Sequence, residues 1–364
     1  MNLLRDELHA MADEAPHIDL TERAIRGARR RRVAGAALAV AAAVAVMTGG
    51  TAVLLGGGTG TGRSVTMAPA TRDVTALPER GVGPLTHAYL SRCPMPRKPD
   101  DECVSGQWRV ATESGTTYAL ADTMGPDRTG RALRSPVAIT KDGRRIAYYS
   151  ERKQTFEVRD LASGRTWKAP LKVREGDFDG ESFLRLSPDG MQLIYTNWSG
   201  MPKPYSVLVD MEKGRTTTLN ATWYPVSVGD GGSPITLVKP SRVWIVGNRP
   251  VAVKNFPYEV SALGPDGRTL VRLGRYVDGR PTAISTFDAL GGAEGPALRV
   301  TGLSDGMSLA RLGGWVSDTE VALLAVPDRS EMESVLYAVN VHTGRARELR
   351  RFADFPAVLP GAAR

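Results

Sequence analysis

From about Thr86 onward, the chain alternates short apolar runs with polar turns roughly every ten residues. The runs are rich in β-branched and aromatic residues, and the breaks are Asp-Gly, Ser-Gly or Pro. Short apolar runs separated by such turns are typical of an all-β fold. No part of this region has the apolar spacing of an amphipathic helix. We therefore expect β-sheets over most of the chain.

A strand–turn–strand element recurs along this region. It consists of two apolar runs separated by an acidic turn. Three copies, in which the turn is Asp-Gly, lie at 139–150, 186–196 and 263–271. A degraded fourth copy lies at 315–323. Asp-Gly readily adopts the backbone dihedrals of a tight hairpin turn. Each copy therefore predicts a β-hairpin.

A second element follows each of these hairpins. It contains Asp or Asn with a Gly four positions later, at 158–165, 208–215 and 338–345 and, less regularly, at 287–292. The acidic residue of the first element precedes the Asp or Asn of the second by 18 to 22 residues in all four units. Two motifs in fixed order indicate a repeated unit of two hairpins, or four strands.

An isolated four-stranded unit cannot bury its apolar faces, so such units stack, and radial stacking gives a β-propeller. Besides the four visible units, a diverged one fits at 223–255 and a first one at 87–124. Six blades over 86–352 average about 44 residues each, a normal blade length. A seven-bladed ring of about 38 residues per blade is the alternative.

The Ser-Pro-Asp-Gly turn at 187–190, the strand that follows it and Val-Asp-Met at 209–211 resemble the repeat of TolB-like and related WD-repeat-like propellers. The resemblance covers about 130–350. The Trp-Asp and Gly-His pairs of true WD repeats are missing, so the TolB-like comparison is closer. It implies propeller architecture and binding of peptides or proteins on the end faces, and it names no partner.

Residues 33–55 form an uncharged apolar run directly after four arginines, Arg29 to Arg32. A helix of this length rises roughly 34 Å, enough to cross a hydrocarbon core of about 30 Å. The flanking arginines predict a cytoplasmic N-terminus and an extracytoplasmic C-terminal domain at the cell membrane. A cleaved signal peptide and a buried core helix are the alternatives, although a signal peptide normally has a shorter apolar core and a shorter leader.

The other segments complete the expected organisation. Residues 1–32 are a cytoplasmic amphipathic helical segment, which either lies at the membrane interface or docks a partner. Residues 56–85 are a flexible linker rich in Gly, Thr and Pro, and 353–364 are a C-terminal tail.

The net charge of the chain is +8, and arginine greatly exceeds lysine. Together with frequent Ala, Gly and Val, this composition is typical of a high-GC bacterium.

Cys93 and Cys103 are the two cysteines of the chain. Outside the membrane, such a closely spaced pair predicts a disulfide that closes a proline-rich loop. Free thiols and a metal site are the alternatives, and a metal site would require further ligands from a chain with four histidines.

Asp177, Asp179 and Glu181 belong to a local acidic cluster. Alternating carboxylates beside glycine could hold Ca²⁺, but we favour solvated charges on a loop between blades. No other cofactor is expected.

No recognisable catalytic set emerges. A Ser-His-Asp triad in the exported part would have to use His87 or His342. A glycosidase needs two carboxylates facing each other across a cleft, whereas most acids here belong to repeat turns, where Asp caps its own backbone. The residues Trp198, Trp223, Tyr224, Trp244 and Tyr258 either line a binding face or pack between blades.

The sequence therefore predicts a non-catalytic binding, scaffold or sensor module for an envelope protein or polymer, with no role in nucleic-acid binding. One alternative is an exported propeller enzyme, of the glycosidase or lyase class, acting on envelope glycans. Another is signalling across the membrane through residues 1–32.

Overall fold

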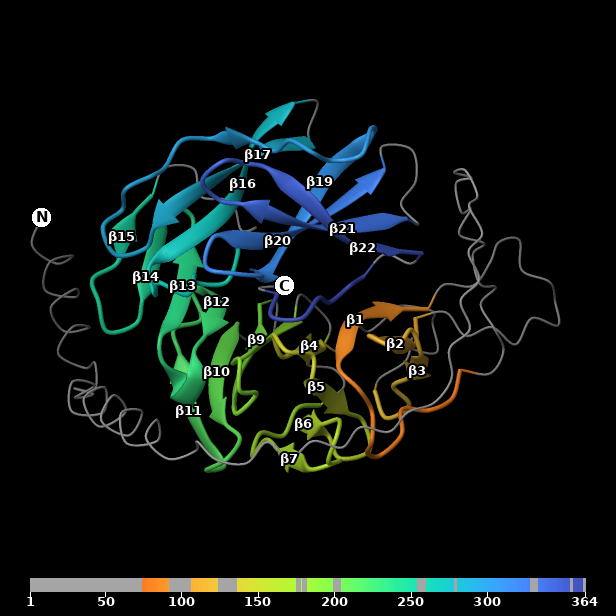
Figure 1. Ribbon diagram of the computed structural model, residues 1–364. Coiled ribbons are helices and arrows are strands. Elements are labelled where there is room, and N and C mark those ends of the chain that lie inside the picture. The colour runs from red at the N-terminus through yellow and green to blue at the C-terminus, as the bar shows by residue number, and fades with distance from the viewer. Residues whose placement is uncertain are drawn as a thin grey trace, which may run out of the picture. The chain divides into compact units, whose positions relative to one another are not determined.

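In the computed structural model of the protein, the C-terminal compact unit spans Val65–Arg364. The structure describes residues 74–91, 106–123, 136–174, 178, 182–198, 204–253, 260–277, 280–327, 333–353 and 356–362. These residues form six antiparallel sheets in which strand order follows chain order (Figure 1). We number the sheets as blades 1 to 6.

The first three blades occupy the first half of the described chain. They contain β1 (Leu85–Leu90), β2 (Trp108–Thr112) and β3 (Thr117–Ala119); β4 (Ala138–Ile139), β5 (Arg145–Ser150), β6 (Thr155–Asp160) and β7 (Thr166–Lys168); and β8 (Ser182–Leu186), β9 (Gln192–Asn197), β10 (Tyr205–Asp210) and β11 (Arg215–Leu219).

The last three blades follow. They contain β12 (Tyr224–Val228), β13 (Ile235–Lys239), β14 (Arg242–Ile245) and β15 (Val251–Ala252), with the short 3₁₀ turn η2 (Asp230–Gly232); β16 (Thr269–Val277), β17 (Arg280–Asp288) and β18 (Leu298–Arg299); and β19 (Met307–Trp315), β20 (Glu320–Pro327), β21 (Ser334–Asn340) and β22 (Ala346–Phe352).

The hairpin turns form where the sequence predicts them, and their acidic side chains explain why. Asp142 Oδ1 accepts a hydrogen bond from Arg144 N at 3.0 Å, which closes the turn between β4 and β5. Gly143 has a φ of +70°, and a Cβ atom there would overlap the Leu85 carbonyl oxygen of blade 1. The Asp-Gly pair therefore forms the turn, and the missing side chain of Gly143 lets blade 1 pack close to it.

The second repeat element caps the turn between the third and fourth strands of a blade. Asp160 Oδ1 accepts from Ser163 N at 2.9 Å in blade 2, and Asp210 Oδ1 accepts from Lys213 N at 2.8 Å in blade 3. Asn340 Oδ1 accepts from Thr343 N at 3.0 Å in blade 6. The repeated Asp or Asn is thus a turn-forming residue, as its spacing predicts.

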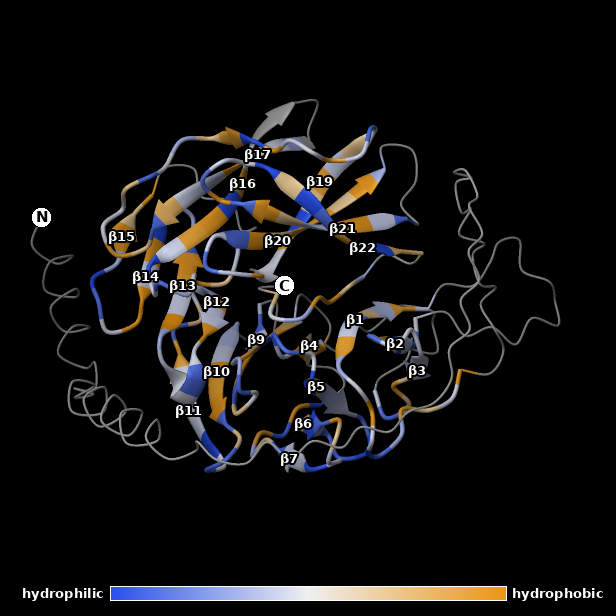
Figure 2. Ribbon diagram, in the orientation of Figure 1, coloured by the Kyte–Doolittle hydropathy of each residue, from blue (hydrophilic) through white to orange (hydrophobic). Residues whose placement is uncertain are grey.

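The apolar core lies between the blades. Figure 2 shows apolar strand interiors and polar turns along the ring. Each buried cluster joins strands of neighbouring sheets, for example Ile139 and Ile146 of blade 2 with Leu85 of blade 1. Because a sheet of three or four strands cannot bury both faces alone, this stacking stabilises every blade.

The first blade is completed by the end of the chain. Residues 356–362, which we call the closing segment, run back from β22 to the middle of the ring (Figure 1). Ala88 N donates to Val358 O at 2.9 Å, and Val358 N donates to Ala88 O at 3.0 Å. The closing segment therefore adds an innermost strand to blade 1 and joins the end of the propeller to its beginning.

These observations confirm the all-β, six-bladed propeller and exclude the seven-bladed alternative. The diverged unit expected at 223–255 is blade 4, and the unit expected at 87–124 is blade 1. Two stretches differ from the expectation. Residues 75–77 pair with β3, although they fall in the predicted linker, and 356–362 pair with β1, although they fall in the predicted tail. Each of these two stretches pairs with its strand through one β-bridge to a residue that is distant in the sequence. The local pattern of apolar and polar residues does not predict such a pairing.

Among the described residues, no helix is long and apolar enough to cross a membrane. The predicted membrane helix at 33–55 and the cytoplasmic segment at 1–32 lie outside the described residues.

Candidate functional site

A cavity of about 380 Å³ lies at the middle of the ring, where the innermost strands end. Every blade contributes to its wall, blade 1 through the closing segment. The lining residues are Lys141, Arg185, Leu186, Pro188, Val226, Ser227, Val228, Gly229, Pro234, Ala262, Leu263, Gly264, Pro265, Gly267, Trp315, Gly361 and Ala362. We call this the central cavity.

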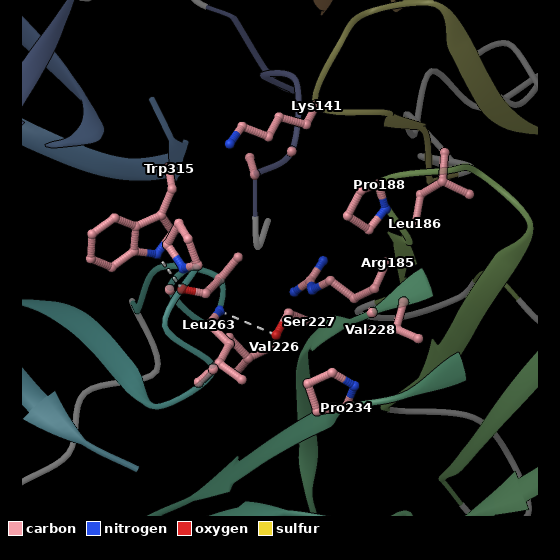
Figure 3. A pocket seen from close by; sticks show the side chains of 17 residues that line it. Lys141, Arg185, Leu186, Pro188, Val226, Ser227, Val228, Pro234, Leu263 and Trp315 are labelled. Atoms are coloured by element: carbon pink, nitrogen blue, oxygen red, sulfur yellow. Dashed lines mark hydrogen bonds between the residues drawn. The ribbon is translucent and has the colours of Figure 1, made fainter. Parts of the chain in front are cut away.

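The walls of the central cavity are mainly apolar. Figure 3 shows Trp315 on one side and Leu186 and Pro188 on another, with the guanidinium of Arg185 extending between them. Two lining side chains, Lys141 and Arg185, are cationic, and none of the lining residues within the described chain is acidic. The cavity is therefore apolar with a positive rim.

Arg185 projects from β8 and is only 4% exposed. Its Nε donates to Pro225 O at 3.1 Å, Nη1 to Leu184 O at 2.8 Å and Nη2 to Tyr224 Oη at 2.8 Å. The guanidinium also lies 5.7 Å from the Phe183 ring centroid and 5.4 Å from that of Tyr224. These contacts hold the guanidinium in place at the wall of the cavity.

Lys141 lies in the turn after β4 and is exposed. Within the described residues its ammonium forms no hydrogen bond or ion pair. The backbone of Gly361 packs against its stem: a Cβ atom on Gly361 would lie 3.2 Å from Lys141 Cβ, and Gly361 has a φ of +62°. Glycine at 361 thus lets the closing segment lie against the lysine.

The opposite wall is fixed by contacts between blades 4, 5 and 6. Trp315 is 5% exposed, and its Nε1 donates to Ala262 O at 2.8 Å. Leu263 N donates to Ser227 Oγ at 3.2 Å, the bond drawn dashed beside Ser227 in Figure 3. These hydrogen bonds between blades fix the position of this wall.

The repeat aspartates lie near the cavity but turn away from it. Asp189 Oδ1 accepts from Ser187 Oγ at 2.6 Å and from Met191 N at 2.9 Å. The Asp266 carboxylate accepts from Thr269 N at 2.9 Å and from Arg268 N at 3.0 Å. Burial alone would raise the pKa of Asp266, but the bonds from Thr269 and Arg268 outweigh it and lower the pKa. Both acids are therefore turn caps that face their own backbone.

Asp288 belongs to the same class of capping residues. The Arg268 side chain donates to it, and this contact lowers the pKa of Asp288 to about 2. Leu290 N donates to Asp288 Oδ1 at 2.9 Å. A carboxyl with such a low pKa is a poor general acid near neutral pH.

A second polar cluster is buried within blade 2. Glu157 is 1% exposed, accepts from Lys153 Nζ at 2.7 Å and lies 3.4 Å from Tyr148 Oη. Burial, followed by the negative charge of Glu157, raises the pKa of Tyr148 to about 12. None of these three residues lines the central cavity.

The two histidines among the described residues, His87 and His342, are placed differently. His87 is 9% exposed in β1, where its Nδ1 lies 2.9 Å from Thr86 Oγ1. Burial, and next the positive charge of Arg350, lowers the pKa of His87 to about 4. His342 lies exposed in the turn after β21. His87 is therefore a neutral packing residue.

The aromatic residues pack between blades. Trp223 and Trp244 have ring centroids 5.5 Å apart, and Trp198 and Tyr224 have centroids 6.1 Å apart. These four residues belong to the clusters that join blades 3, 4 and 5. Tyr258 lies outside the described residues.

The site residues proposed from the sequence also lie outside the described residues. This applies to Cys93 and Cys103 of the predicted disulfide and to Asp177, Asp179 and Glu181 of the alternative calcium site. In the part of the chain that is described, no group of three or more His, Cys, Asp or Glu could hold a metal ion.

The sequence analysis did not identify the cationic residues of the central cavity. One available signal was Arg185, which stands between Leu184 and Leu186 in a short strand. A charge at such a position is unusual in a strand buried on both faces. Lys141, just before an Asp-Gly turn, carries no comparable signal.

The closed ring of six sheets with a cavity at its middle defines the class of this protein, a six-bladed β-propeller. No protein-family model and no curated protein matches the chain.

Similar solved structures include the putative TolB of Agrobacterium tumefaciens, with 13% identity, a TM-score of 0.42 and coverage of 61% of this chain and 82% of that one. They also include the hydrazine synthase of Kuenenia stuttgartiensis, with 13% identity, a TM-score of 0.39 and coverage of 58% and 64%. A third is dipeptidyl peptidase 4 of Porphyromonas gingivalis, with 11% identity, a TM-score of 0.37 and coverage of 62% and 40%.

Proposed function

We propose that this protein is a non-catalytic binding module, acting as a scaffold or sensor for an envelope protein or polymer through the middle of its propeller. The main support is the central cavity, to which every blade contributes. Its wall is apolar and carries Lys141 and Arg185, while the repeat aspartates nearby serve as turn caps. A concave, mainly apolar site with a few fixed polar groups is typical of ligand binding.

The same features favour binding over glycan cleavage. A glycosidase uses two carboxylates that face each other across the substrate. The described residues that line the cavity supply cations and apolar groups instead. We therefore rank an exported glycosidase or lyase second, and we propose no cofactor.

We also propose that the propeller is held outside the cell membrane by a helix at 33–55, with the N-terminus in the cytoplasm. The support is the uncharged run itself and the four arginines that precede it. Alkaline phosphatase fused after Arg364 should be active in intact cells, and a green fluorescent protein fused there should be dark. The reverse pattern would contradict this topology.

Photo-crosslinking in native membranes tests the binding role. A photoreactive residue would replace Leu263 at the cavity wall or, as a matched control, Leu349, which is 37% exposed on the outer strand β22. We expect one dominant adduct at 263, identifiable by mass spectrometry, and none at 349. Adducts only at 349, or turnover of a cell-wall glycan by the purified chain, would overturn the proposal.

A further inference from the structure

We propose that the outer edge of blade 3 pairs with the same edge of a second copy of this chain, so that one antiparallel sheet runs across both molecules. The edge is strand β11, whose sequence is Arg-Thr-Thr-Thr-Leu. This inference concerns the rim of the propeller and goes beyond the proposed role of the central cavity.

The outer edge of β11 has no neighbour among the described residues. β11 is the last strand of its sheet, and it pairs with β10 from Arg215, opposite Asp210, to Leu219, opposite Ser206 (Figure 1). No other strand, isolated bridge or main-chain hydrogen bond joins β11 to the rest of the described chain. Its first four residues are exposed. Alternate N–H and C=O groups along this edge are therefore open to another strand.

The other five blades protect their outer edges in ways that β11 does not. Blade 1 covers β3 with the stretch at 75–77. The outer strands of blades 2, 4 and 5 have only two or three residues each. The outer strand of blade 6, β22, is longer but bears the charged residues Arg347, Glu348, Arg350 and Arg351. Covering segments, short strands and charges are the usual devices against edge-to-edge pairing, and β11 has only the charge of its first residue.

The sequence of β11 fits a second copy of itself. In an antiparallel pair centred on Thr217, that residue faces its own counterpart and Thr216 faces Thr218 of the second copy. Because the register is symmetric, the residues whose main-chain groups point outward meet each other in both copies. Threonine pairs across antiparallel strands are favourable.

The charges around β11 also permit this pairing. In the register centred on Thr217, Arg215 faces Leu219 of the second copy, and the charged residues at 212 and 213 face 222 and 221. Residues 216–223 carry no charge. No like charges therefore face each other across the two strands.

The same arrangement is unfavourable for β22. If two copies of β22 paired around Leu349, Arg347 would face Arg351 of the second copy on both sides of the twofold axis. Like charges that face each other across antiparallel strands destabilise the pair. Leu349 is exposed at the centre of its strand, as Thr217 is in β11, so β22 supplies a matched control edge.

The two paired edges form a small interface. Stable protein–protein interfaces bury at least about 1,000 Å², more than two five-residue strands supply alone, so we expect a weak dimer that forms at high protein concentration. A covalent trap detects such a dimer better than a measurement of size. Opposite Cα atoms of an antiparallel pair lie about 4.5 or 5.5 Å apart, which is within the usual range for a disulfide.

The test is oxidation of the full chain at high concentration after Thr217→Cys. The disulfide-linked dimer is quantified on a non-reducing gel, and the linkage between the two residues at 217 is identified by mass spectrometry. The original chain gives the background due to Cys93 and Cys103, and Leu349→Cys tests the edge of blade 6. We expect roughly ten times more dimer from Thr217→Cys than from Leu349→Cys, because only the second pairing brings arginines together.

Charges at the two flanking threonines test the register. In the Thr217→Cys chain, Thr216→Lys combined with Thr218→Lys places lysine opposite lysine on both sides of the axis, and the amount of dimer should fall roughly tenfold. Thr216→Lys combined with Thr218→Glu places lysine opposite glutamate on both sides, and the amount of dimer should be restored. Both combinations change only exposed side chains of β11, so neither should alter the fold.

Equal amounts of dimer from the lysine–lysine and lysine–glutamate combinations would overturn the proposal, because the crosslink would not depend on this register. The same conclusion would follow if Thr217→Cys crosslinked no more than Leu349→Cys, or if it formed a disulfide only with a different protein. The photoreactive residue at 263 tests the proposed binding function separately, since Leu263 lines the central cavity and β11 lies at the rim.

Discussion

The seam between blades 2 and 3 and the seam between blades 6 and 1 are held in different ways. Blades 2 and 3 are consecutive in the chain and share a buried aromatic cluster. The ring centroids of Phe156 and Tyr195 lie 4.6 Å apart, and those of Tyr149 and Phe178 lie 4.7 Å apart. Aromatic pairs of this kind supply both buried area and a preferred geometry.

Blades 6 and 1 come from opposite ends of the propeller and meet through the closing segment. Arg311 Nη1 of blade 6 donates to Ala357 O at 2.6 Å, and Ala357 N donates to Ala88 O of blade 1 at 2.9 Å. The aromatic contact at this seam includes a histidine, since His87 and Phe352 have ring centroids 4.6 Å apart. Ring closure therefore depends on a short non-covalent strand beside a titratable group, and that strand also lines the central cavity.

Deleting the chain from Pro356 onward should have the largest effect. It removes the buried Val358 and Leu359 side chains, about 1.5–3 kcal/mol each, and several main-chain hydrogen bonds worth about 1 kcal/mol each. We expect the free energy of unfolding to fall by about 5 kcal/mol, measured by urea denaturation. His342→Ala, on an exposed turn, is the control and should leave the midpoint nearly unchanged. An unchanged midpoint after the deletion would mean that the segment does not close the ring.

Phe156→Ala should be the most damaging single substitution at the seam between blades 2 and 3. Phe156 is fully buried between Tyr149 and Tyr195. Removing a buried phenyl ring leaves a cavity and costs about 3–5 kcal/mol, measurable by the same denaturation. Because Phe156 and the closing segment belong to different apolar clusters, the hydrogen-exchange protection of the closing segment should persist in the folded state of the variant. A decrease in the free energy of unfolding of less than about 1 kcal/mol would show that the aromatic cluster does not stabilise this seam.

Acid should weaken the seam between blades 6 and 1. Folding lowers the pKa of His87 from 6.5 to about 4. Between these values the unfolded chain binds more protons than the folded one, so stability falls as the pH decreases. The His87 contribution is fully present above pH 6.5, and about 3 kcal/mol is lost by pH 4.

Urea midpoints measured at pH 7.5, 5.5 and 4.5 test this prediction. Between pH 7.5 and 4.5, the urea midpoint of His87→Leu should fall less than that of the original chain. Tyr149→Phe at the other seam, which removes the hydrogen bond from Tyr149 Oη to Val173 O, should keep the original pH dependence. If the midpoint of His87→Leu changed with pH as much as that of the original chain, groups other than His87 would cause the acid sensitivity.

Gly361→Ala should have the smallest effect. The residue adopts a φ of +62°, and its Cβ atom would lie 3.2 Å from Lys141 Cβ. A non-glycine residue in this conformation costs about 1–2 kcal/mol, and the close contact with Lys141 should add to that cost, so that the urea midpoint falls more than in the control. Gly214→Ala is the matched control, because Gly214 also has a positive φ, of +60°, but has open space around it. An equal loss in both variants would mean that the contact with Lys141 contributes nothing.

The blades could be predicted from the sequence because their turns are local. Asp142 and Asp189 cap hairpins through hydrogen bonds that span two residues, so each turn leaves a signature in the chain. Blade 4 has Asp230-Gly231 between β12 and β13, but this blade was located from the space between its neighbours and from its apolar runs at 235–238 and 243–246.

The closing segment and the central cavity could not be predicted in the same way. Ala357, Val358 and Leu359 form too short an apolar run to indicate a strand, and their partner β1 lies at the other end of the propeller. Lys141 and Arg185 come together only because the ring places the ends of different innermost strands around one space. Closure of the ring, which is a long-range property, creates the site.

Hydrogen exchange of the full chain tests this central claim most directly. If the closing segment is the innermost strand of blade 1, the amides of Ala88, Val358 and Gly361, which all donate main-chain hydrogen bonds, should be protected as strongly as those in the middle of β5 and β9. Exchange of Val358 and Gly361 at the rate of an open tail, with β5 and β9 still protected, would contradict the account.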